Sequence, residues 1–273
     1  MNDKIIELCH KKSRELQVPF NIVLIYYFLE SILSLVANSK YKENFVFKGG
    51  LLLSNIVGID SRTTKDIDFL VDKISLDKET IVDVFLDILD QSKEIKFTIK
   101  SCDEIKSNDE YKGYRLKIEA AINNINQPLS IDVATADVIT PDKVNYEYRS
   151  SFGNDINIYS YPLETYLAEK FETIYTKGMF NSRMKDFYDI FILKLEMNNH
   201  IRVDILRRAL NATFENRESQ FSVEEMIDLL QDIKNDDTMI SYWNKYANAN
   251  LFAKDIPFSG IIDTCMQLLY DIK

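Results

Sequence analysis

Cysteine and histidine are scarce in this chain, which has three cysteines and two histidines among 273 residues. Cys9, Cys102 and Cys265 lie far apart in the sequence, and no CxxC pair occurs. This pattern argues against a Cys/His zinc site and against a disulfide framework, and it fits reduced thiols in a cytosolic compartment. The chemistry of the protein must therefore come from carboxylates, lysines and backbone groups.

Positive charge is also in deficit, since 33 lysines and arginines face 43 aspartates and glutamates, for a formal net charge of −10. A protein with this charge does not coat DNA in bulk, because its overall field repels phosphate. A polynucleotide partner would have to meet a local basic patch or a bound metal ion. The hydrophobic fraction of 46% is ample for a globular core and excludes a disordered chain.

One apolar run, from Phe20 to Ala37, approaches the length of a membrane span. It contains Asn21, Glu30 and Ser34, and no basic segment with a cleavage site precedes it. We therefore expect a buried helix here and not a transmembrane or signal segment. The expected protein is cytoplasmic and has no membrane partner.

The first part of the chain mixes helical and strand-like periodicity. Helices are predicted over 3–16 and 20–38, and Pro19 opens the second of them. Short strands are predicted at Phe45–Phe47, Ile67–Val71, Lys96–Ser101, Tyr114–Ala121, Leu129–Ala134 and Ile156–Tyr159. A further helix is predicted over 77–93, after the second strand.

Strand signals end at Pro162. Helices are predicted over 163–177, 183–197, 202–215, 222–234 and 258–271. Ser222 and Glu225 form a capping box at the start of the fourth of these helices. The predicted fold class is α+β, with a mixed-sheet module and N-terminal helices over 1–160, followed by a helical module over 161–273.

Two aspartates interrupt an apolar strand in KDIDFLV. Residues i and i+2 of a strand share a face, so Asp66 and Asp68 project together, while Ile67 and Phe69 project to the other side. The two like charges repel, and a divalent metal ion or nearby Lys or Arg would offset that cost. Asp132 stands on the polar face of the apolar strand LSIDVA. If the two strands are neighbours, three carboxylates converge as ligands for Mg²⁺.

The glycine pair in FVFKGGLLL precedes this strand. Gly49 and Gly50 lack a Cβ, so a backbone there can approach a triphosphate closely. If the residues after them open a helix, its free N–H groups would point at the anion. Lys48, Arg62 and Lys65 supply positive charge nearby.

Each of these features also has a plain structural interpretation. A Gly-Gly pair is more often a turn than a phosphate cradle, and a DxD beside a loop is more often solvated surface or a cap. A single aspartate such as Asp132 is more often a structural polar residue. The order of glycine pair, DxD and a third aspartate on a later strand favours an active site over the three separate interpretations.

This order of motifs resembles the nucleotidyltransferase superfamily whose fold is typified by DNA polymerase β. More closely, KGG with an apolar run and then RTTKDIDF is similar to the AbiEii/MenT group of toxins from type IV toxin–antitoxin and abortive-infection systems. The segment from Tyr161 to Leu193 resembles the later motifs of that group, a lysine on an "AEK" helix and an R-x-KD-x-x-D segment. The resemblance covers roughly residues 24–195.

The resemblance implies a reaction as well as a polymerase-β-like fold. The expected enzyme transfers a nucleoside monophosphate from an NTP to an acceptor hydroxyl, with Mg²⁺ bound by Asp66 and Asp68 and the site completed by Asp132. The implied acceptor is the 3′ end of tRNA, and the implied result is arrested translation, as in defence against phage. A cognate antitoxin, which need not contact the toxin, is the expected partner.

Two departures from the family pattern concern the nucleotide. The family usually has a small hydroxylated residue after the glycines, where this chain has Leu51. Ser54 or the backbone could supply the phosphate contact in its place. The 15 residues between Gly50 and Asp66 are also rather many.

The helical module adds further candidate residues. Lys170 lies at the edge of an apolar helix face, where the residues alone favour a lysine that shields the core and whose removal leaves folding intact. The resemblance assigns it to charge neutralisation on the triphosphate. Asp186 and Asp189 share a helix face, and either surface ion pairing with Arg183 and Lys185 or helix capping would explain them. The resemblance implies that Asp186 orients Lys170 or the acceptor hydroxyl.

Basic residues of the same module are mixed with acids, so a solvated face is the default interpretation. They are also the best local candidates for holding a polynucleotide. This basic set is Lys177, Arg183, Lys185, Lys194, Arg202, Arg207 and Arg208. Two other hypotheses remain open: a nucleotide-binding regulator without transfer, and transfer of the nucleotide to a protein or a small molecule.

Overall fold

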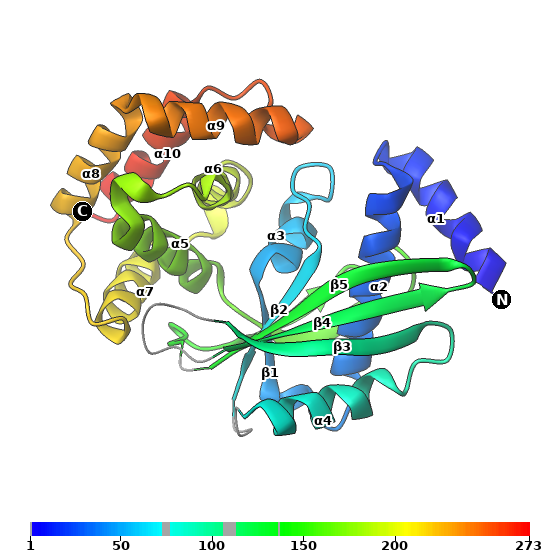
Figure 1. Ribbon diagram of the computed structural model, residues 1–273. Coiled ribbons are helices and arrows are strands. Elements are labelled where there is room, and N and C mark those ends of the chain that lie inside the picture. The colour runs from blue at the N-terminus through cyan, green and yellow to red at the C-terminus, as the bar shows by residue number, and fades with distance from the viewer. Residues whose placement is uncertain (1, 73–76, 106–112, 136) are drawn as a thin grey trace. The chain divides into compact units, whose positions relative to one another are not determined.

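The computed structural model describes residues 2–72, 77–105, 113–135 and 137–273. The chain divides into two compact units, one of Met1–Asp137 with Lys143–Ser160 and the other of Val138–Asp142 with Tyr161–Lys273 (Figure 1). The first unit holds the sheet, and the second is helical. The short segment Val138–Asp142 groups with the helices, because Thr140 exchanges two 2.9 Å hydrogen bonds with the hydroxyl of Thr165.

The first unit contains a mixed seven-stranded sheet in the order β3-β4-β5-β2-β1-β7-β6. Its strands are β1 (Phe45–Lys48), β2 (Asp66–Val71), β3 (Lys96–Ile105), β4 (Gly113–Ile122), β5 (Ile125–Ala134), β6 (Val144–Tyr148) and β7 (Ile156–Ser160). The central strand β2 runs parallel to β5 and antiparallel to β1. Both neighbours therefore present side chains beside the aspartates of β2.

One face of this sheet is an aromatic core. Phe45 and Phe69 are fully buried and pack edge to face, with ring centroids 5.4 Å apart. Phe85 of helix α4 (Lys78–Leu89) packs on Phe45 at the same centroid distance. Figure 1 shows α4 running along the strands on that side. Because strand residues alternate between faces, the side chains of Asp66 and Asp68 lie on the opposite face of β2.

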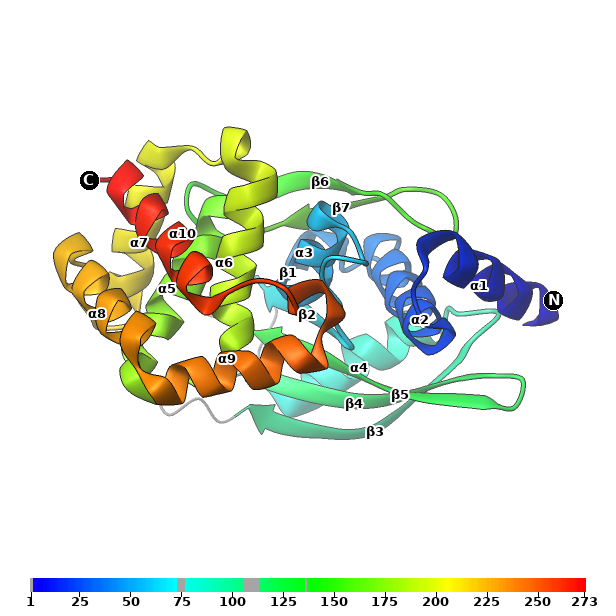
Figure 2. The same ribbon diagram turned by 90° about the horizontal axis from the view of Figure 1, so that it is seen from above.

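Helices α1 (Asn2–Leu16), α2 (Phe20–Ala37) and α3 (Gly49–Val57) complete the first unit. By length and composition, α2 is the one helix in the described ranges that could cross a membrane, and 56% of that window is buried inside the protein. In Figures 1 and 2 the turn between β4 and β5 lies near α1, where Asn123 donates a 3.0 Å hydrogen bond to Asp3. The helix predicted over 20–38 is confirmed.

The second unit is built from α5 (Leu163–Lys177), α6 (Met184–Met197), α7 (Val203–Asn216), α8 (Val223–Asn235), α9 (Asp237–Ala249) and α10 (Phe258–Asp271). Its core includes Phe187 of α6, which packs edge to face on Phe258 of α10 at 6.0 Å. The predicted cap of α8 is present, because the Ser222 hydroxyl accepts a hydrogen bond from the backbone N–H of Glu225 at 3.2 Å. The Glu225 carboxylate instead accepts from Tyr175.

Among the α-helices and strands of the described residues, two were not predicted from the sequence. Helix α9 buries only Met239, Trp243 and Ala247, so its apolar stripe is too narrow to stand out, and its signal is the cap formed by Asp236. Strand β6 is mostly polar and half-exposed, and pairing with β7 fixes it as a strand. A third difference is that α3 begins at Gly49 itself, two residues before the start that the sequence suggested.

Candidate active site

Strand β2 presents its two aspartates on one face of the sheet. Asp66 and Asp68 are half-buried, whereas Ile67 and Phe69 between and beyond them are 0% and 1% exposed. This confirms the alternation predicted from KDIDFLV. The two carboxylates therefore lie on the face opposite the aromatic core, with an apolar layer behind them.

Strand β5 lies beside β2, as the hypothesis of three carboxylates required. In the parallel register Asp132 is the partner of Asp68, and cross-strand partners share a face of the sheet. Both oxygens of Asp132, however, accept hydrogen bonds from Arg115 of β4, at 2.7 Å from Nε and 2.6 Å from Nη2. Among the residues that the structure describes, no group of three His, Cys, Asp or Glu side chains is placed to hold a metal ion. The strands thus bring the three aspartates onto one face without closing them into a ready metal site.

Gly49 touches the second aspartate of the pair. Its φ of +75° lies in the left-handed region, and a Cβ built on it would come within 2.0 Å of Oδ2 of Asp68. Any other residue would be strained in its backbone and would overlap the carboxylate. Since α3 begins at this glycine, the Asp68 side chain and the first turn of α3 are in direct contact.

The second glycine faces the loop that leads into β2. A Cβ at Gly50 would come within 3.0 Å of Oγ1 of Thr64 and 3.3 Å of Nη2 of Arg62. Arg62 is only 7% exposed, whereas Lys65 is exposed. Of the predicted phosphate-binding cations, the structure therefore places Arg62 against the glycine turn and Lys65 at the surface of the protein.

Ser54 lies inside α3 and is 2% exposed. Its hydroxyl donates to the carbonyl oxygen of Gly50 at 2.9 Å and accepts from the hydroxyl of Tyr26 at 2.8 Å. The Tyr26 oxygen in turn accepts from the backbone N–H of Thr64 at 3.1 Å. The structure thus gives Ser54 a place in the support of the glycine turn, and its predicted phosphate contact stays a prediction. Leu51 is fully buried.

Lys48 is the last residue of β1 and the register partner of Asp68. Its ammonium lies 2.7 Å from Oδ2 of Asp137, and both side chains are largely buried. The residue therefore sits beside the aspartate pair in register, while an ion pair holds its charged end on Asp137.

The second unit contains a buried ion cluster built from α5 and α6. The Lys170 ammonium lies 2.7 Å from Oδ1 of Asp186 and 3.1 Å from Oδ2 of Asp189. Tyr166 donates a 3.0 Å hydrogen bond to Asp189, and Arg183 Nε donates to Oδ2 of Asp186 at 2.7 Å. Asp186 and Asp189 are both fully buried, so Lys170 is held by two carboxylates and is not a lysine that only shields the core.

The cluster fixes the charge states of its members. Burial alone would raise the pKa of Asp186, but the charges of Lys170 and Arg183 outweigh it and lower that pKa to about 2. Burial alone would lower the pKa of Lys170, but Tyr166 and the two carboxylates raise it well above its ordinary value. Lys170 therefore carries a full positive charge at neutral pH.

A tight turn joins α5 to α6 and exposes large apolar side chains. Phe180 is 94% exposed and Met179 36% exposed, in the 3₁₀ turn Gly178–Phe180. Lys177 before the turn and Lys185 after it are also exposed. An exposed aromatic residue with exposed lysines before and after it in the sequence has the composition of a surface that contacts single-stranded nucleic acid.

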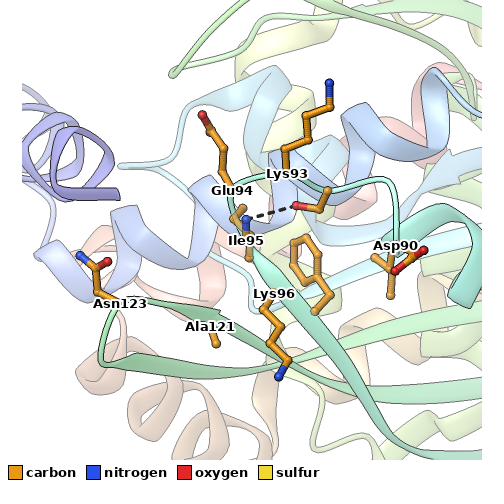
Figure 3. A pocket seen from close by; sticks show the side chains of 10 residues that line it. Asp90, Lys93, Glu94, Ile95, Lys96, Ala121 and Asn123 are labelled. Atoms are coloured by element: carbon orange, nitrogen blue, oxygen red, sulfur yellow. Dashed lines mark hydrogen bonds between the residues drawn. The ribbon is translucent and has the colours of Figure 1, made fainter. Parts of the chain in front are cut away.

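A shallow hollow of about 520 Å³ lies where β3 begins and β4 ends (Figure 3). Its lining is Leu89, Asp90, Ser92, Lys93, Glu94, Ile95, Lys96, Phe97, Ala121 and Asn123. In Figure 3 the amino groups of Lys93 and Lys96 point in opposite directions, so the charged groups do not converge on a common ligand position. Lys96 begins β3 and Ala121 is close to the end of β4, whereas Arg115 is close to the start of β4. The hollow is separate from the aspartate pair.

Several partners in these arrangements carry no clear signal in the sequence, and Arg115, Tyr26 and Tyr166 are three of them. Arg115 and Lys117 alternate with apolar residues, as exposed residues of any strand do. Only the register of β4 against β5 shows that Arg115 pairs with Asp132. Tyr26 is one aromatic residue in an apolar helix, and nothing local indicates its bond to Ser54. Tyr166 carried a weak signal, since it lies one helical turn before Lys170.

The sequence and the fold were also compared with those of known proteins, and the sequence matches one family. Residues 31–263 match the family model described as "Nucleotidyl transferase AbiEii toxin, Type IV TA system". Two solved structures share the fold at 14% sequence identity. One is a candidate nucleotidyltransferase from H. pylori, with a TM-score of 0.57 over 93% of this chain and 96% of that chain. The other is JHP933 from Helicobacter pylori, with a TM-score of 0.55 over 92% and 90%. Among curated proteins, none matches the chain. Because the family model spans most of the sequence, the chain belongs to the AbiEii nucleotidyltransferase toxins of type IV toxin–antitoxin systems.

Proposed function

We propose that this nucleotidyltransferase transfers a nucleoside monophosphate from an NTP to the hydroxyl at the 3′ end of a tRNA, and that it requires Mg²⁺. The acceptor hydroxyl gives up its proton to solvent, its oxygen bonds to the α-phosphorus, and the bond from that phosphorus to the leaving pyrophosphate breaks. The observation that carries the proposal is the contact between Asp68 and Gly49, which joins a carboxylate pair to the first turn of α3.

The donor set suits a hard divalent cation. Asp66 and Asp68 offer carboxylate oxygens on one face, and Asp132 lies beside Asp68 in the next strand. When bound, the ion would neutralise charge on the triphosphate and orient its oxygens. The family generally uses a divalent metal ion, which agrees with this donor set.

The chain's own groups position the nucleotide. Gly49 and Gly50 form the first turn of α3, where free N–H groups favour an anion. Arg62 and Lys48 lie beside this turn, and Lys65 follows at the surface. These groups act on charge that the substrate already carries, so their contribution is positioning and neutralisation.

Lys170 and Asp186 have a second proposed role. The Lys170 ammonium neutralises negative charge on the triphosphate as pyrophosphate leaves, and Asp186 keeps that ammonium charged and oriented. The raised pKa of Lys170 supports this role, because a neutral amine could not supply the charge.

The proposed acceptor is RNA because the chain offers a local contact for it despite a net charge of −10. Phe180 is 94% exposed, and the exposed Lys177 and Lys185 lie three residues before it and five residues after it in the sequence. A solvent-exposed ring can stack on an unpaired base, and flanking cations can hold the adjoining phosphates. The free 3′ end of a tRNA is single-stranded, so it fits this chemistry. The proposed setting is the cytoplasm, with a cognate antitoxin that need not bind the protein.

The test is incubation of the purified protein with each α-labelled NTP, Mg²⁺ and total RNA. Label on tRNA is the expected result. Asp66→Asn and Asp68→Asn should each lower the labelling rate by about 100-fold or more, because each removes a metal ligand and a charge that orients the substrate. Neither change should lower the melting temperature, since each removes one of two repelling charges.

Asp83→Asn is the matched control. Asp83 is an exposed carboxylate of α4, and its removal should leave labelling unchanged. Full activity of Asp66→Asn or Asp68→Asn would overturn the assignment of the metal site. Label on protein or on a small molecule, with none on RNA, would overturn the choice of acceptor while keeping the transfer reaction.

A further inference from the structure

A row of charged residues crosses five strands of the sheet at one level. Lys48 is the partner of Asp68, Asp68 of Asp132, Asp132 of Arg115, and Arg115 of Asp103. Cross-strand partners share a face, so these side chains start from the face that carries the aspartate pair. Arg115 is the basic residue that this row places next to the third aspartate.

The charged residues at either side of Arg115 and Asp132 in this row have other partners, so Arg115 and Asp132 pair with each other. Lys48 is held 2.7 Å from Asp137. Asp103, on the other side of Arg115, accepts from Lys117 at 3.0 Å and from Ser101 at 3.0 Å. Asp132, in contrast, gives both of its oxygens to the fork of Arg115.

Arg115 also lies close to the aspartate pair in register. Its partner Asp132 is itself the partner of Asp68, so one strand separates Arg115 from the strand that carries Asp66 and Asp68. The Arg115 side chain is 45% exposed, so it can leave Asp132 for solvent without losing a buried position.

We propose that Arg115 is the resident counter-ion of the carboxylate site, and that it must leave Asp132 before a divalent metal ion can bind all three aspartates. This inference rests on the proposed metal site. A guanidinium and a divalent cation repel each other, and the two oxygens that the fork occupies are the ones a metal would need. Bound to Asp132, Arg115 offsets one of the three negative charges and occupies both oxygens of the third aspartate.

The test measures metal binding by the full chain without nucleotide. Mn²⁺ is titrated into the protein, and the free ion is counted by electron paramagnetic resonance. Arg115→Ala should bind Mn²⁺ about fivefold more tightly than the wild type, the factor that corresponds to loss of a competing, half-exposed ion pair. Arg115→Lys keeps a charge without the two-pronged fork, and its affinity should lie between the two.

Lys117→Ala is the matched control. Lys117 lies on the same strand and the same face, but it pairs with Asp103, so its removal should leave Mn²⁺ affinity unchanged. In an Asp132→Asn background, Arg115→Ala should no longer tighten binding, because the group for which the ions compete is gone. Equal or weaker Mn²⁺ binding by Arg115→Ala would overturn the inference.

The proposed metal site and the role of Arg115 fail in different ways. If Asp66→Asn and Asp68→Asn leave Mn²⁺ binding unchanged, the metal site itself is wrong. If those two changes abolish binding while Arg115→Ala does not alter it, the metal site stands and Arg115 is only a structural partner of Asp132.

Discussion

Each unit of the protein contains a buried carboxyl group, Glu30 in the first and Asp186 in the second. Hydroxyl and backbone donors surround Glu30, whereas cations surround Asp186. Glu30 of α2, in the first unit, is 5% exposed and accepts hydrogen bonds from the hydroxyl of Ser150 at 2.6 Å, the backbone of Ser151 at 3.2 Å and the hydroxyl of Tyr148 at 3.1 Å. Within the described residues, no cation pairs with it. Burial raises the pKa of Glu30 to about 7, although these donors oppose the shift.

Asp186 of the second unit is buried even more completely, yet its pKa moves down. Burial raises it, but Lys170 and Arg183 lower it to about 2. The difference shows that burial alone does not set the charge of a carboxylate in this fold. Glu30 reaches neutrality by taking up a proton near pH 7, whereas Asp186 stays ionised because a cation is built in beside it.

Of the changes considered, Lys170→Ala should lower the stability of the protein the most, because it removes the cation that keeps Asp186 ionised. It leaves Asp186 and Asp189 buried without their shared ammonium, which should lower the free energy of unfolding by about 3–5 kcal/mol. Urea-induced unfolding monitored by circular dichroism measures the loss. Lys177→Ala removes an exposed lysine of the same helix and should cost under about 0.5 kcal/mol.

A neutral version of the cluster separates charge from packing. Combining Lys170→Met with Asp186→Asn and Asp189→Asn removes every buried charge together and should recover most of the lost stability. If Lys170→Ala were as stable as Lys177→Ala, the cluster would be solvated in solution and the contrast with Glu30 would disappear.

Glu30→Gln should change how the stability of the protein depends on pH. A carboxyl whose folded-state pKa is raised contributes stability that is fully present below the unfolded pKa, near 4.5, and that is lost as pH rises through about 7. Relative to the wild type, Glu30→Gln should therefore gain stability between pH 5 and pH 8, by up to about 3 kcal/mol.

Melting temperatures of both proteins across that pH range measure the gain. Glu147→Gln is the control, because Glu147 is exposed on β6 beside Tyr148 and its removal should leave the pH profile unchanged. A constant difference between wild type and Glu30→Gln at every pH would show that Glu30 has an ordinary affinity for protons.

Arg183→Ala carries the smallest expected effect. Arg183 is the second cation on Asp186, but its side chain is 47% exposed, and exposed ion pairs contribute little. The free energy of unfolding should fall by about 0.5 kcal/mol or less. A loss as large as that of Lys170→Ala would mean that the exposed cation, and not the buried one, keeps Asp186 ionised.

Periodicity predicted the parts of the molecule whose signal is local. The alternation in β2 and β5 placed Asp66, Asp68 and Asp132 on polar strand faces, and the structure confirms that these strands are neighbours. The amphipathic pattern predicted helices over 163–177 and 258–271, and α5 and α10 begin and end at these residues. Each of these signals is carried by residues within one element.

The rest depends on register and on packing between elements. Arg115 is an ordinary exposed strand residue until β4 is paired with β5, and only then does it face Asp132. Lys170 looks like a surface lysine until α5 packs on α6 and two carboxylates surround it. Helix α9 buries three side chains in thirteen residues, too few to be recognised without its neighbours.

The left-handed bend at Gly49 has a genetic consequence. Every other amino acid brings a Cβ to a position 2.0 Å from the Asp68 carboxylate, so no missense change at this codon is conservative. In a culture selected for escape from growth arrest, inactivating alleles should recur at this single codon, alongside those at the two aspartates.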